Sequence, residues 1–191
     1  MKIVSGSLSG IYEISFTSHQ DHRGSFTRLY DQGVFENYGL HRHWVQENRS
    51  YTKQKGTIRG LHFQFPPFAE TKMIRVSKGA IWDVFVDLRK ESPTFAKWGS
   101  CQLTEDNDKM LYISQGFAHG FCTLTDDCEV IYKVDNFYSP ALEGGILWND
   151  RDLRIDWPIT TPILSRKDGE ALSLKEFIKM YEGIEIRKGL K

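Results

Sequence analysis

The chain has 191 residues, of which 40% are hydrophobic and 26% are charged, a composition typical of one globular domain. Its 25 Lys and Arg residues balance 25 Asp and Glu residues, so it lacks the basic excess that steers proteins to nucleic acid. The three cysteines lack CxxC spacing, which disfavours a disulfide framework or a zinc ribbon and favours reduced thiols. No apolar run approaches the length of a membrane span or a signal-peptide core. We therefore expect a cytoplasmic protein that binds neither membranes nor nucleic acids.

Short runs in which hydrophobic and polar residues alternate predict β-strands along most of the chain. The alternation is clearest in residues 81–88 and 129–134. Turn-forming residues separate such runs at 78–80, 91–93 and 105–107. Many short strands without intervening helices indicate an all-β sandwich or barrel.

The C-terminal part has a different pattern. Ser173 and Glu176 have the spacing of a helix capping box, and four hydrophobic residues follow at helical intervals, namely Leu174, Phe177, Ile178 and Tyr181. We expect one amphipathic helix on the outside of the β body. The chain has no internal repeat or linker, so we expect a single domain over residues 1–191. Its β body covers about 2–158, and the C-terminal segment with its helix covers about 159–191.

The segment that begins at Gly56 keeps the glycine spacing of a cupin metal-binding motif but changes its ligands. In that motif a glycine precedes His-x-His, which is followed by a glutamate and then by a second glycine. Gly56, His62 and Gly79 keep their places here, whereas Gln64 replaces the second histidine and Lys72 replaces the glutamate. A lysine ammonium has no lone pair for a metal and repels a cation. The motif therefore predicts a barrel without a metal, in which an imidazole, an ammonium and an amide suit proton transfer beside a carbonyl.

Nine motifs occur in order along the chain. They are Asp-x-Arg-Gly-x-Phe (Asp21–Phe26), Val45–Asn48, Ile58–Gln64, Val84–Arg89, Glu91–Phe95, Gly116–Phe121, Tyr138–Pro140, Ile146–Asp150 and Ile155–Pro158. Together, over residues 2 to 170, they resemble the dTDP-4-dehydrorhamnose 3,5-epimerase family. The resemblance implies a cupin jelly roll with a few peripheral helices, acting as a homodimer without metal or other cofactor. It also implies that the substrate is a nucleoside-diphosphate 4-keto-6-deoxyhexose, epimerised at C3, C5 or both.

The same resemblance implies roles for individual residues. His62 corresponds to the catalytic base and Asp168 to the carboxylate that orients it, while Lys72 stabilises the oxyanion and Tyr132 is the acid. Tyr138 and Phe26 lie where the family stacks the base. The full set of expected substrate-binding residues is Arg23, Phe26, Arg28, Gln46, Asn48, Arg59, His119 and Tyr138.

Elementary chemistry agrees with these roles. A proton next to a ketone becomes removable when a buried cation stabilises the developing enolate, and Lys72 supplies a cation. Histidine is the natural base near neutral pH, and a hydroxyl on the opposite face can return the proton. Strict strand alternation, however, puts Arg59 and His62 on opposite faces. A bulge at Gly60 would bring both side chains to the same face.

Two features leave alternatives open. Rhamnose-pathway members of the family commonly carry a glutamate at the position of Arg28. If this side chain contacts the base, a guanidinium suits the cytosine N3 acceptor and a carboxylate suits the thymine N3–H; otherwise Arg28 faces solvent or a phosphate. The alternative within the class is thus an epimerase of a CDP-linked or other sugar nucleotide. Gln64 and Lys72 disfavour a metal-dependent cupin oxygenase. A non-catalytic sugar-binding cupin is also disfavoured, because it would not need the set of His62, Asp168, Lys72 and Tyr132. Enzymes that invert one or both centres share these residues.

Overall fold

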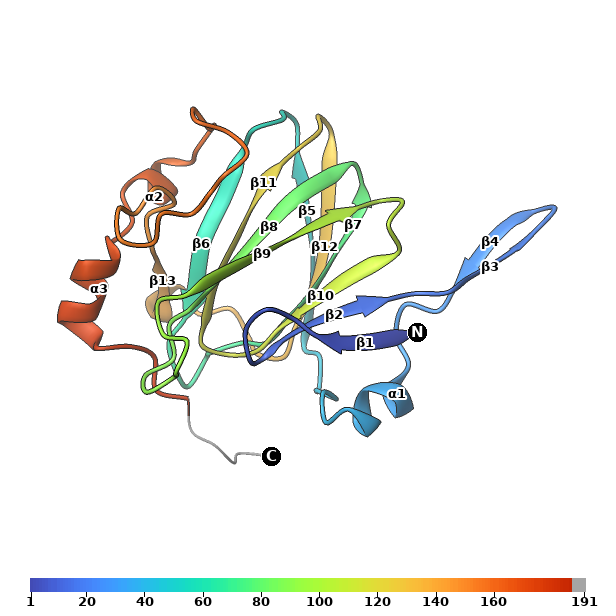
Figure 1. Cartoon of the computed structure of the whole chain (residues 1–191), viewed down its shortest axis with the longest axis horizontal. Helices are drawn as coiled ribbons and strands as arrows, with labels where there is room; N and C mark the ends of the chain where they lie inside the picture. Colours follow the sequence, from blue (N-terminus) through green and yellow to red (C-terminus); the bar gives the residue numbers. More distant parts are fainter. Residues whose placement is uncertain (187–191) are drawn as a thin grey trace.

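The computed structural model describes residues 1–186 and consists mostly of β-strands (Figure 1). The strands are β1 (Lys2–Ser5), β2 (Ile11–Ser15), β3 (Ser18–Asp21), β4 (Gly24–Thr27), β5 (Gln46–Thr52), β6 (Ile58–Gln64), β7 (Lys72–Lys78), β8 (Ala80–Asp87), β9 (Trp98–Thr104), β10 (Lys109–Ile113), β11 (Phe117–Thr123), β12 (Cys128–Val134) and β13 (Glu143–Gly145). The helices are α1 (Gln32–Asn37), α2 (Arg166–Gly169), α3 (Leu174–Tyr181) and the 3₁₀ turn η1 (Pro140–Leu142).

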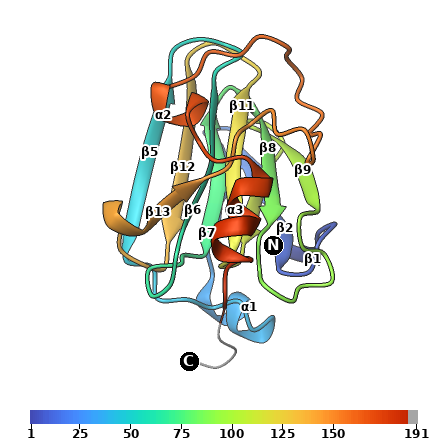
Figure 2. The same cartoon turned by 90° about the vertical axis from the view of Figure 1, so that its left-hand side faces the viewer.

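Two antiparallel sheets face each other and form the body. One sheet has the strand order β1-β2-β10-β7-β12-β5, and the other has the order β13-β6-β11-β8-β9. Apart from the consecutive pairs β1–β2 and β8–β9, neighbours in each sheet come from distant parts of the sequence, which is the crossed connectivity expected of a jelly roll. The predicted all-β jelly roll with a few peripheral helices is confirmed (Figures 1 and 2).

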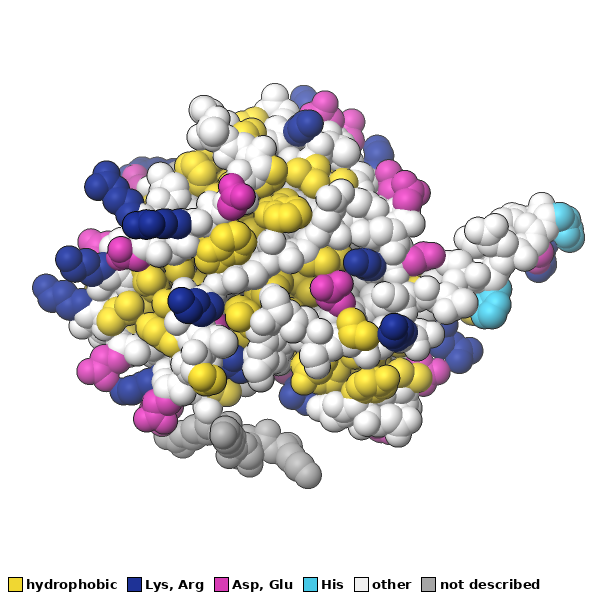
Figure 3. All heavy atoms as spheres, in the orientation of Figure 1, with side chains coloured by type: hydrophobic (Ala, Val, Ile, Leu, Met, Phe, Trp, Pro, Cys, Tyr) yellow, Lys and Arg dark blue, Asp and Glu magenta, His cyan; other side chains and the backbone are white. Residues whose placement is uncertain are grey.

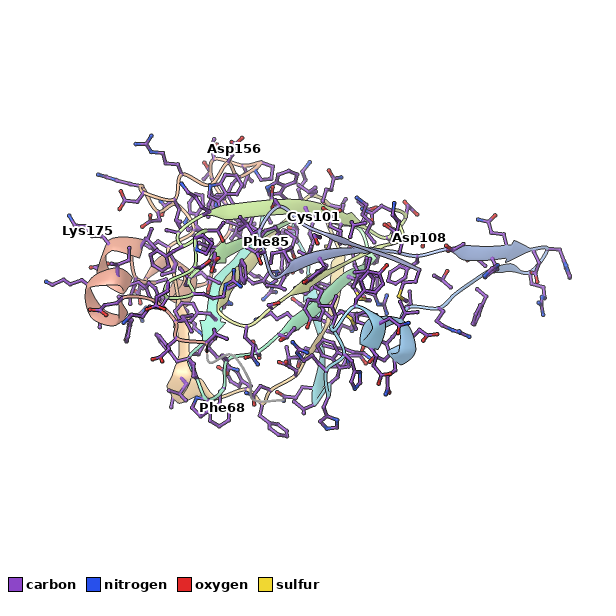
Figure 4. All side chains as sticks on the ribbon, turned by 60° about the horizontal axis from the view of Figure 1, so that its bottom comes forward. Phe68, Phe85, Cys101, Asp108, Asp156 and Lys175 are labelled. Atoms are coloured by element: carbon purple, nitrogen blue, oxygen red, sulfur yellow. The ribbon has the colours of Figure 1, made fainter. Side chains whose placement is uncertain are left out.

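Both faces of the five-stranded sheet are buried, which explains why β8 is hydrophobic at nearly every position. Ile81 and Phe85 point into the core between the sheets, where Phe85 lies near Cys101 (Figure 4). Val84 and Val86 point the other way and pack with residues of the C-terminal segment. The predicted alternation of residues 81–88 is therefore confirmed, with a hydrophobic partner on each side.

The C-terminal helix α3 covers the outer face of this sheet (Figure 2). Its capping box is present, since the Glu176 N–H donates to Ser173 Oγ at 3.2 Å and the Ser173 N–H donates to Glu176 Oε2 at 2.9 Å. Leu174 and Phe177 are buried, whereas Lys175 points into solvent (Figure 4). A cap of this kind contributes about 1 kcal/mol, and the two buried side chains attach the helix to the body.

A hairpin formed by β3 and β4 projects far from the body (Figure 1). In the part of the chain that the structure describes, these strands pair only with each other. The base of the hairpin is anchored to Asp108, which accepts a hydrogen bond from Ser18 Oγ at 3.0 Å (Figure 4). Histidine and charged side chains gather toward its tip (Figure 3). The projection was not predicted, because alternation within a strand does not indicate which strand it pairs with.

None of the helices within residues 1–186 combines the length and the hydrophobicity needed to cross a membrane.

Candidate active site

A cavity of about 450 Å³ opens between the two sheets, and a neighbouring cavity of about 380 Å³ shares His62, Lys72 and Tyr132 with it. Nine of the twelve site residues predicted from the sequence line these two spaces, namely Gln46, Asn48, Arg59, His62, Lys72, His119, Tyr132, Tyr138 and Asp168. They come from β5, β6, β7, β11 and β12, from the segment after β12 and from α2. The jelly roll thus gathers residues that are more than 120 positions apart in sequence.

His62 and Asp168 form a close pair at the wall made by the five-stranded sheet. His62 Nε2 lies 2.6 Å from Oδ1 of Asp168, and the carboxylate is 4% exposed. The short helix α2 positions Asp168, because the Ser165 side chain caps it by accepting a hydrogen bond from the Asp168 N–H. The Gly60 N–H points to the second carboxylate oxygen at 3.5 Å.

Opposing effects on the pKa of Asp168 decide where the hydrogen of the pair lies. Burial by itself acts to raise the pKa of Asp168, but hydrogen bonds from His62, Ser165 and Gly60, together with the charge of His62, hold it below its ordinary value. An ionised carboxylate only accepts hydrogen bonds, so Nε2 of His62 carries the hydrogen. Nδ1 then keeps a lone pair with which it can take a proton.

Arg59 and His62 line the same cavity although they are an odd number of residues apart. The pairing of β6 with β11 shifts register here: His62 is opposite His119, and Arg59 is opposite Phe121. Three steps along β6 therefore match two steps along β11, which is the bulge that the sequence suggested at Gly60. Gly60 has φ +129°, and a Cβ there would lie 2.5 Å from the Cα of Gly120. Strands β6 and β11 can approach this closely because both residues are glycine.

Lys72 and Tyr132 stand on the opposite wall, in the six-stranded sheet. Tyr132 is opposite Asn48 of β5 and Ile74 of β7, so strand alternation places Lys72, Tyr132 and Asn48 on the same inner face. Lys72 is buried, with 11% of its side chain exposed. A base on one sheet thus faces a cation and a phenol on the other.

His119 is held by a carboxylate that the sequence analysis did not single out. Its Nε2 lies 2.8 Å from Oδ2 of Asp83, a fully buried residue of β8. Burial raises the pKa of Asp83, while His119 and the charge of Lys72 oppose that rise. Asp83 thus fixes the orientation of the His119 ring, which lines the cavity.

Comparison with known proteins assigns the chain to a family. Residues 5–176 match the family model described as dTDP-4-dehydrorhamnose 3,5-epimerase. The chain belongs to this family. It is 48% identical over 149 residues to the dTDP-4-dehydrorhamnose 3,5-epimerase of Shigella flexneri, covering 78% of this chain and 82% of that one. The dTDP-4-dehydrorhamnose 3-epimerase of Streptomyces niveus is 37% identical over 170 residues, covering 88% of this chain and 82% of that one.

A solved structure agrees with this assignment. The crystal structure of dTDP-4-dehydrorhamnose 3,5-epimerase from Bacillus anthracis, with TDP and PPi bound, is 47% identical to this chain. It superposes with a TM-score of 0.88 and covers 91% of this chain and 99% of its own. Family membership and the cupin-type jelly roll, both expected from the motifs, are therefore confirmed.

The structure adds two residues to the site of this epimerase-family protein. Glu143 of β13 accepts a hydrogen bond from the Tyr138 hydroxyl at 2.7 Å and pairs with Lys167, which precedes Asp168 in α2. Burial acts to raise the pKa of Glu143, but Lys167 and Tyr138 hold it below its ordinary value. Neither residue carries a local sequence signal, because β13 joins the sheet only through its pairing with β6.

Tyr138 closes one side of the site. Its backbone N–H donates to Gln46 Oε1 at 2.9 Å, and its side chain is largely exposed, so one ring face is open to a ligand. Asn48 lines the same space two residues further along β5. These residues form a polar border with one aromatic surface beside the cavity.

Three predicted binding residues, Arg23, Phe26 and Arg28, do not line the two cavities that the other nine surround. Arg23 and Phe26 are on the projecting hairpin, and Phe26 is 66% exposed. Arg23 pairs with Asp21, and Arg28 pairs with Asp31 at 3.2 Å. The physical reason is that β3 and β4 extend away from both sheets instead of folding back onto them (Figure 1).

Within residues 1–186, no three His, Cys, Asp or Glu side chains come together in an arrangement that could hold a metal ion. Gln64 and Lys72, at the changed cupin ligand positions, are both engaged in hydrogen bonds or an ion pair with protein groups.

Proposed function

We propose that this chain epimerises a nucleoside-diphosphate 4-keto-6-deoxyhexose at C3, C5 or both, by the conversion typical of dTDP-4-dehydro-6-deoxyglucose to dTDP-4-dehydrorhamnose. Membership of the epimerase family supports this proposal. The observation that carries it is the placement of the His62–Asp168 pair on one wall of the cavity, opposite Lys72 and Tyr132 on the other. Inverting a carbon centre requires proton removal on one face and proton return on the opposite face.

In the first step, His62 takes the proton from the carbon next to the C4 ketone. The electron pair of the broken C–H bond forms a C=C bond, and the carbonyl electrons move to O4. The ammonium of Lys72 donates to the negative O4, and in a partly water-excluded cavity such a donor is worth about 10²–10³-fold in rate. Asp168 stabilises the imidazolium that His62 becomes, because its carboxylate is ionised.

In the second step, the enolate collapses and the same carbon takes a proton from the hydroxyl of Tyr132 on the other face. The C4 carbonyl re-forms, and the phenolate of Tyr132 and the imidazolium of His62 then exchange a proton through solvent. The enzyme returns to its starting state, and the centre is inverted without net gain or loss of atoms. General acid–base steps of this kind contribute about 10²–10⁴-fold each.

The binding residues suit the remainder of the substrate. Arg59 and His119 offer donors for the sugar and diphosphate, and Tyr138 offers a ring for the base. The Bacillus anthracis relative was crystallised with TDP and PPi, which supports a thymidine nucleotide as the first candidate. A CDP-linked substrate is the alternative that Arg28 suggests.

We also propose that the working unit is a homodimer in which each hairpin serves the partner subunit. The support is geometric, since Arg23 and the exposed Phe26 lie outside the cavity of their own chain. The exposed aromatic ring at the border of that cavity is Tyr138, and Phe26 of a partner could supply a second. A second copy related by a two-fold axis would receive the hairpin and bury Phe26. The three cysteines are buried free thiols, which supports a reducing compartment such as the cytoplasm.

Solvent deuterium exchange tests the proposed reaction. The wild-type protein, incubated in D₂O with dTDP-4-dehydro-6-deoxyglucose, should incorporate deuterium at C3, C5 or both, and NMR of the product reports which centres were inverted. His62→Ala should abolish the exchange, and Asp168→Asn should leave a small residual rate because the wrong tautomer is favoured. Exchange at the wild-type rate in His62→Ala would refute the assignment of the base.

A further inference from the structure

Lys72 has an ion-pair partner inside the cavity. Its Nζ lies 2.9 Å from Oε1 of Glu70, and both side chains are 11% exposed. Glu70 lies two residues before Lys72, just outside β7, and lines the same space as His62 and Tyr132. A buried ammonium and a buried carboxylate are each costly to desolvate, and pairing offsets that cost.

Gln64 holds the other oxygen of this carboxylate. Its Nε2 donates to Glu70 Oε2 at 3.1 Å and to the backbone oxygens of Phe68 and Phe137 at 2.9 and 3.2 Å. Its Oε1 accepts from the Ser139 N–H at 2.6 Å. Gln64 is 3% exposed, and every polar atom of its side chain is engaged. The loop that contains Phe68 lies at the edge of the body between β6 and β7 (Figure 4).

The two positions at which this chain departs from a metal-binding cupin are thus joined through one carboxylate, in the order Gln64, Glu70, Lys72. We propose that Glu70 is a positioning residue for the reaction, which holds Nζ of Lys72 at one place on the wall and aims its remaining N–H groups into the cavity. This inference rests on the proposed function, because it assigns a partner to the group that stabilises the enolate.

The geometry explains why the arrangement matters. An ammonium has three N–H donors. Glu70 takes one of them at the edge of the cavity, and two remain for the O4 of the sugar. A lysine side chain has several rotatable bonds, so without a fixed partner its charge would sample many places. Gln64 fixes Glu70, which in turn fixes Nζ on the wall opposite His62.

Other ionisable groups face this cation from the surrounding elements. They are His62 on β6, Asp83 on β8, His119 on β11, Tyr132 on β12, Glu143 on β13 and Asp168 on α2. Among residues 1–186, Glu70 is the carboxylate that forms an ion pair with Lys72. Asp83 is engaged by His119 and Asp168 by His62.

The test is deuterium exchange catalysed by Glu70→Ala and Glu70→Gln. Glu70→Ala removes the acceptor for Lys72 and should lower kcat by about ten-fold or more with KM little changed, because Nζ is then no longer aimed at O4. Glu70→Gln keeps the volume and an acceptor for Lys72 and should recover most of that loss. Glu47→Ala is the matched control, because Glu47 is an exposed carboxylate on β5 that points away from the cavity. Its kcat should coincide with that of the wild type.

A second measurement does not depend on turnover. The Nζ resonance of Lys72, labelled with ¹⁵N and identified by its loss in Lys72→Met, should be sharp in the wild type and in Glu70→Gln and broadened in Glu70→Ala, where Nζ has no fixed partner. Equal kcat in Glu70→Ala and the wild type would overturn the proposal, and so would a loss in Glu70→Ala that Glu70→Gln does not recover. If wild-type protein exchanges no deuterium with any 4-keto sugar nucleotide, the proposed function fails instead, while the Nζ resonance still reports the ion pair.

Discussion

Two impaired variants should regain activity when mixed if the β3–β4 hairpin of one subunit serves the cavity of its partner. The first variant is His62→Ala, which removes the base from the body and leaves the hairpin intact. The second combines Arg23→Ala and Phe26→Ala, which strips the hairpin and leaves the body intact. In a mixed dimer, the cavity of the second chain contains His62 and receives the intact hairpin of the first chain.

The activity expected of the mixture is higher than that expected of either variant alone. Loss of a general base costs about 10²–10⁴-fold. Loss of an aromatic stacking surface costs about 1–3 kcal/mol per base, which is roughly ten- to a hundred-fold in binding. Each variant alone should therefore keep roughly a tenth or less of wild-type kcat/KM. Random pairing makes about half of the dimers mixed, and each has one complete site, so activity should recover to about one quarter of the wild type.

The assay is deuterium wash-in after the two differently tagged chains are co-expressed or unfolded and refolded together. Tyr138→Ala paired with His62→Ala is the control, since both changes lie in the body and no mixed dimer has a complete cavity. If the hairpin–body mixture recovers no more activity than this body–body mixture, the hairpin does not complete the partner's site. Light scattering that gives a monomer mass with activity intact would also refute the dimer.

Four further outcomes are expected. Lys72→Met should lower turnover by about 10²-fold or more, and chelator-treated enzyme should keep full activity; a stoichiometric metal that restores lost activity would contradict this. Gly60→Ala should lower both the melting temperature and the exchange rate, because the new Cβ meets Gly120 Cα at 2.5 Å and φ is +129°; unchanged values would show that the bulge is not needed. Arg28→Glu should shift preference from CDP- toward dTDP-linked substrate by about ten- to a hundred-fold, the effect of about 1–3 kcal/mol for a mispaired base; equal ratios in direct competition would show that Arg28 does not contact the base. The pKa of Asp168 is lower in the folded protein than in the unfolded chain. The ionised carboxylate therefore stabilises the fold at pH values above the range in which the unfolded carboxyl titrates. This stabilisation is lost as the pH falls through the folded pKa. The stability difference between the wild type and Asp168→Asn, measured by denaturant unfolding, should therefore shrink in acid, and a constant difference would contradict the assignment.

Local pattern was sufficient where neighbours along the chain decide the structure. The capping box at Ser173 and the helical spacing after it specified α3, because both depend on residues within two turns. Alternation specified the faces of β8, since successive side chains in a strand point to opposite sides. The nine motifs spread over residues 2 to 170 also identified the family, because their residues and order can be read along the chain without knowing which strands pair.

Only the tertiary structure decided which distant groups meet. Arg59 and His62 share a face because β11 pairs with β6 across a register shift, which depends on the close approach of Gly60 and Gly120. Glu143 and Lys167 reach the cavity through β13 and α2, and no residue near them in sequence indicates this. The strands of the projecting hairpin pair with each other and with neither sheet. Pairing partners and register depend on the summed contacts of whole sheets, so a local pattern predicts the strands but not their neighbours.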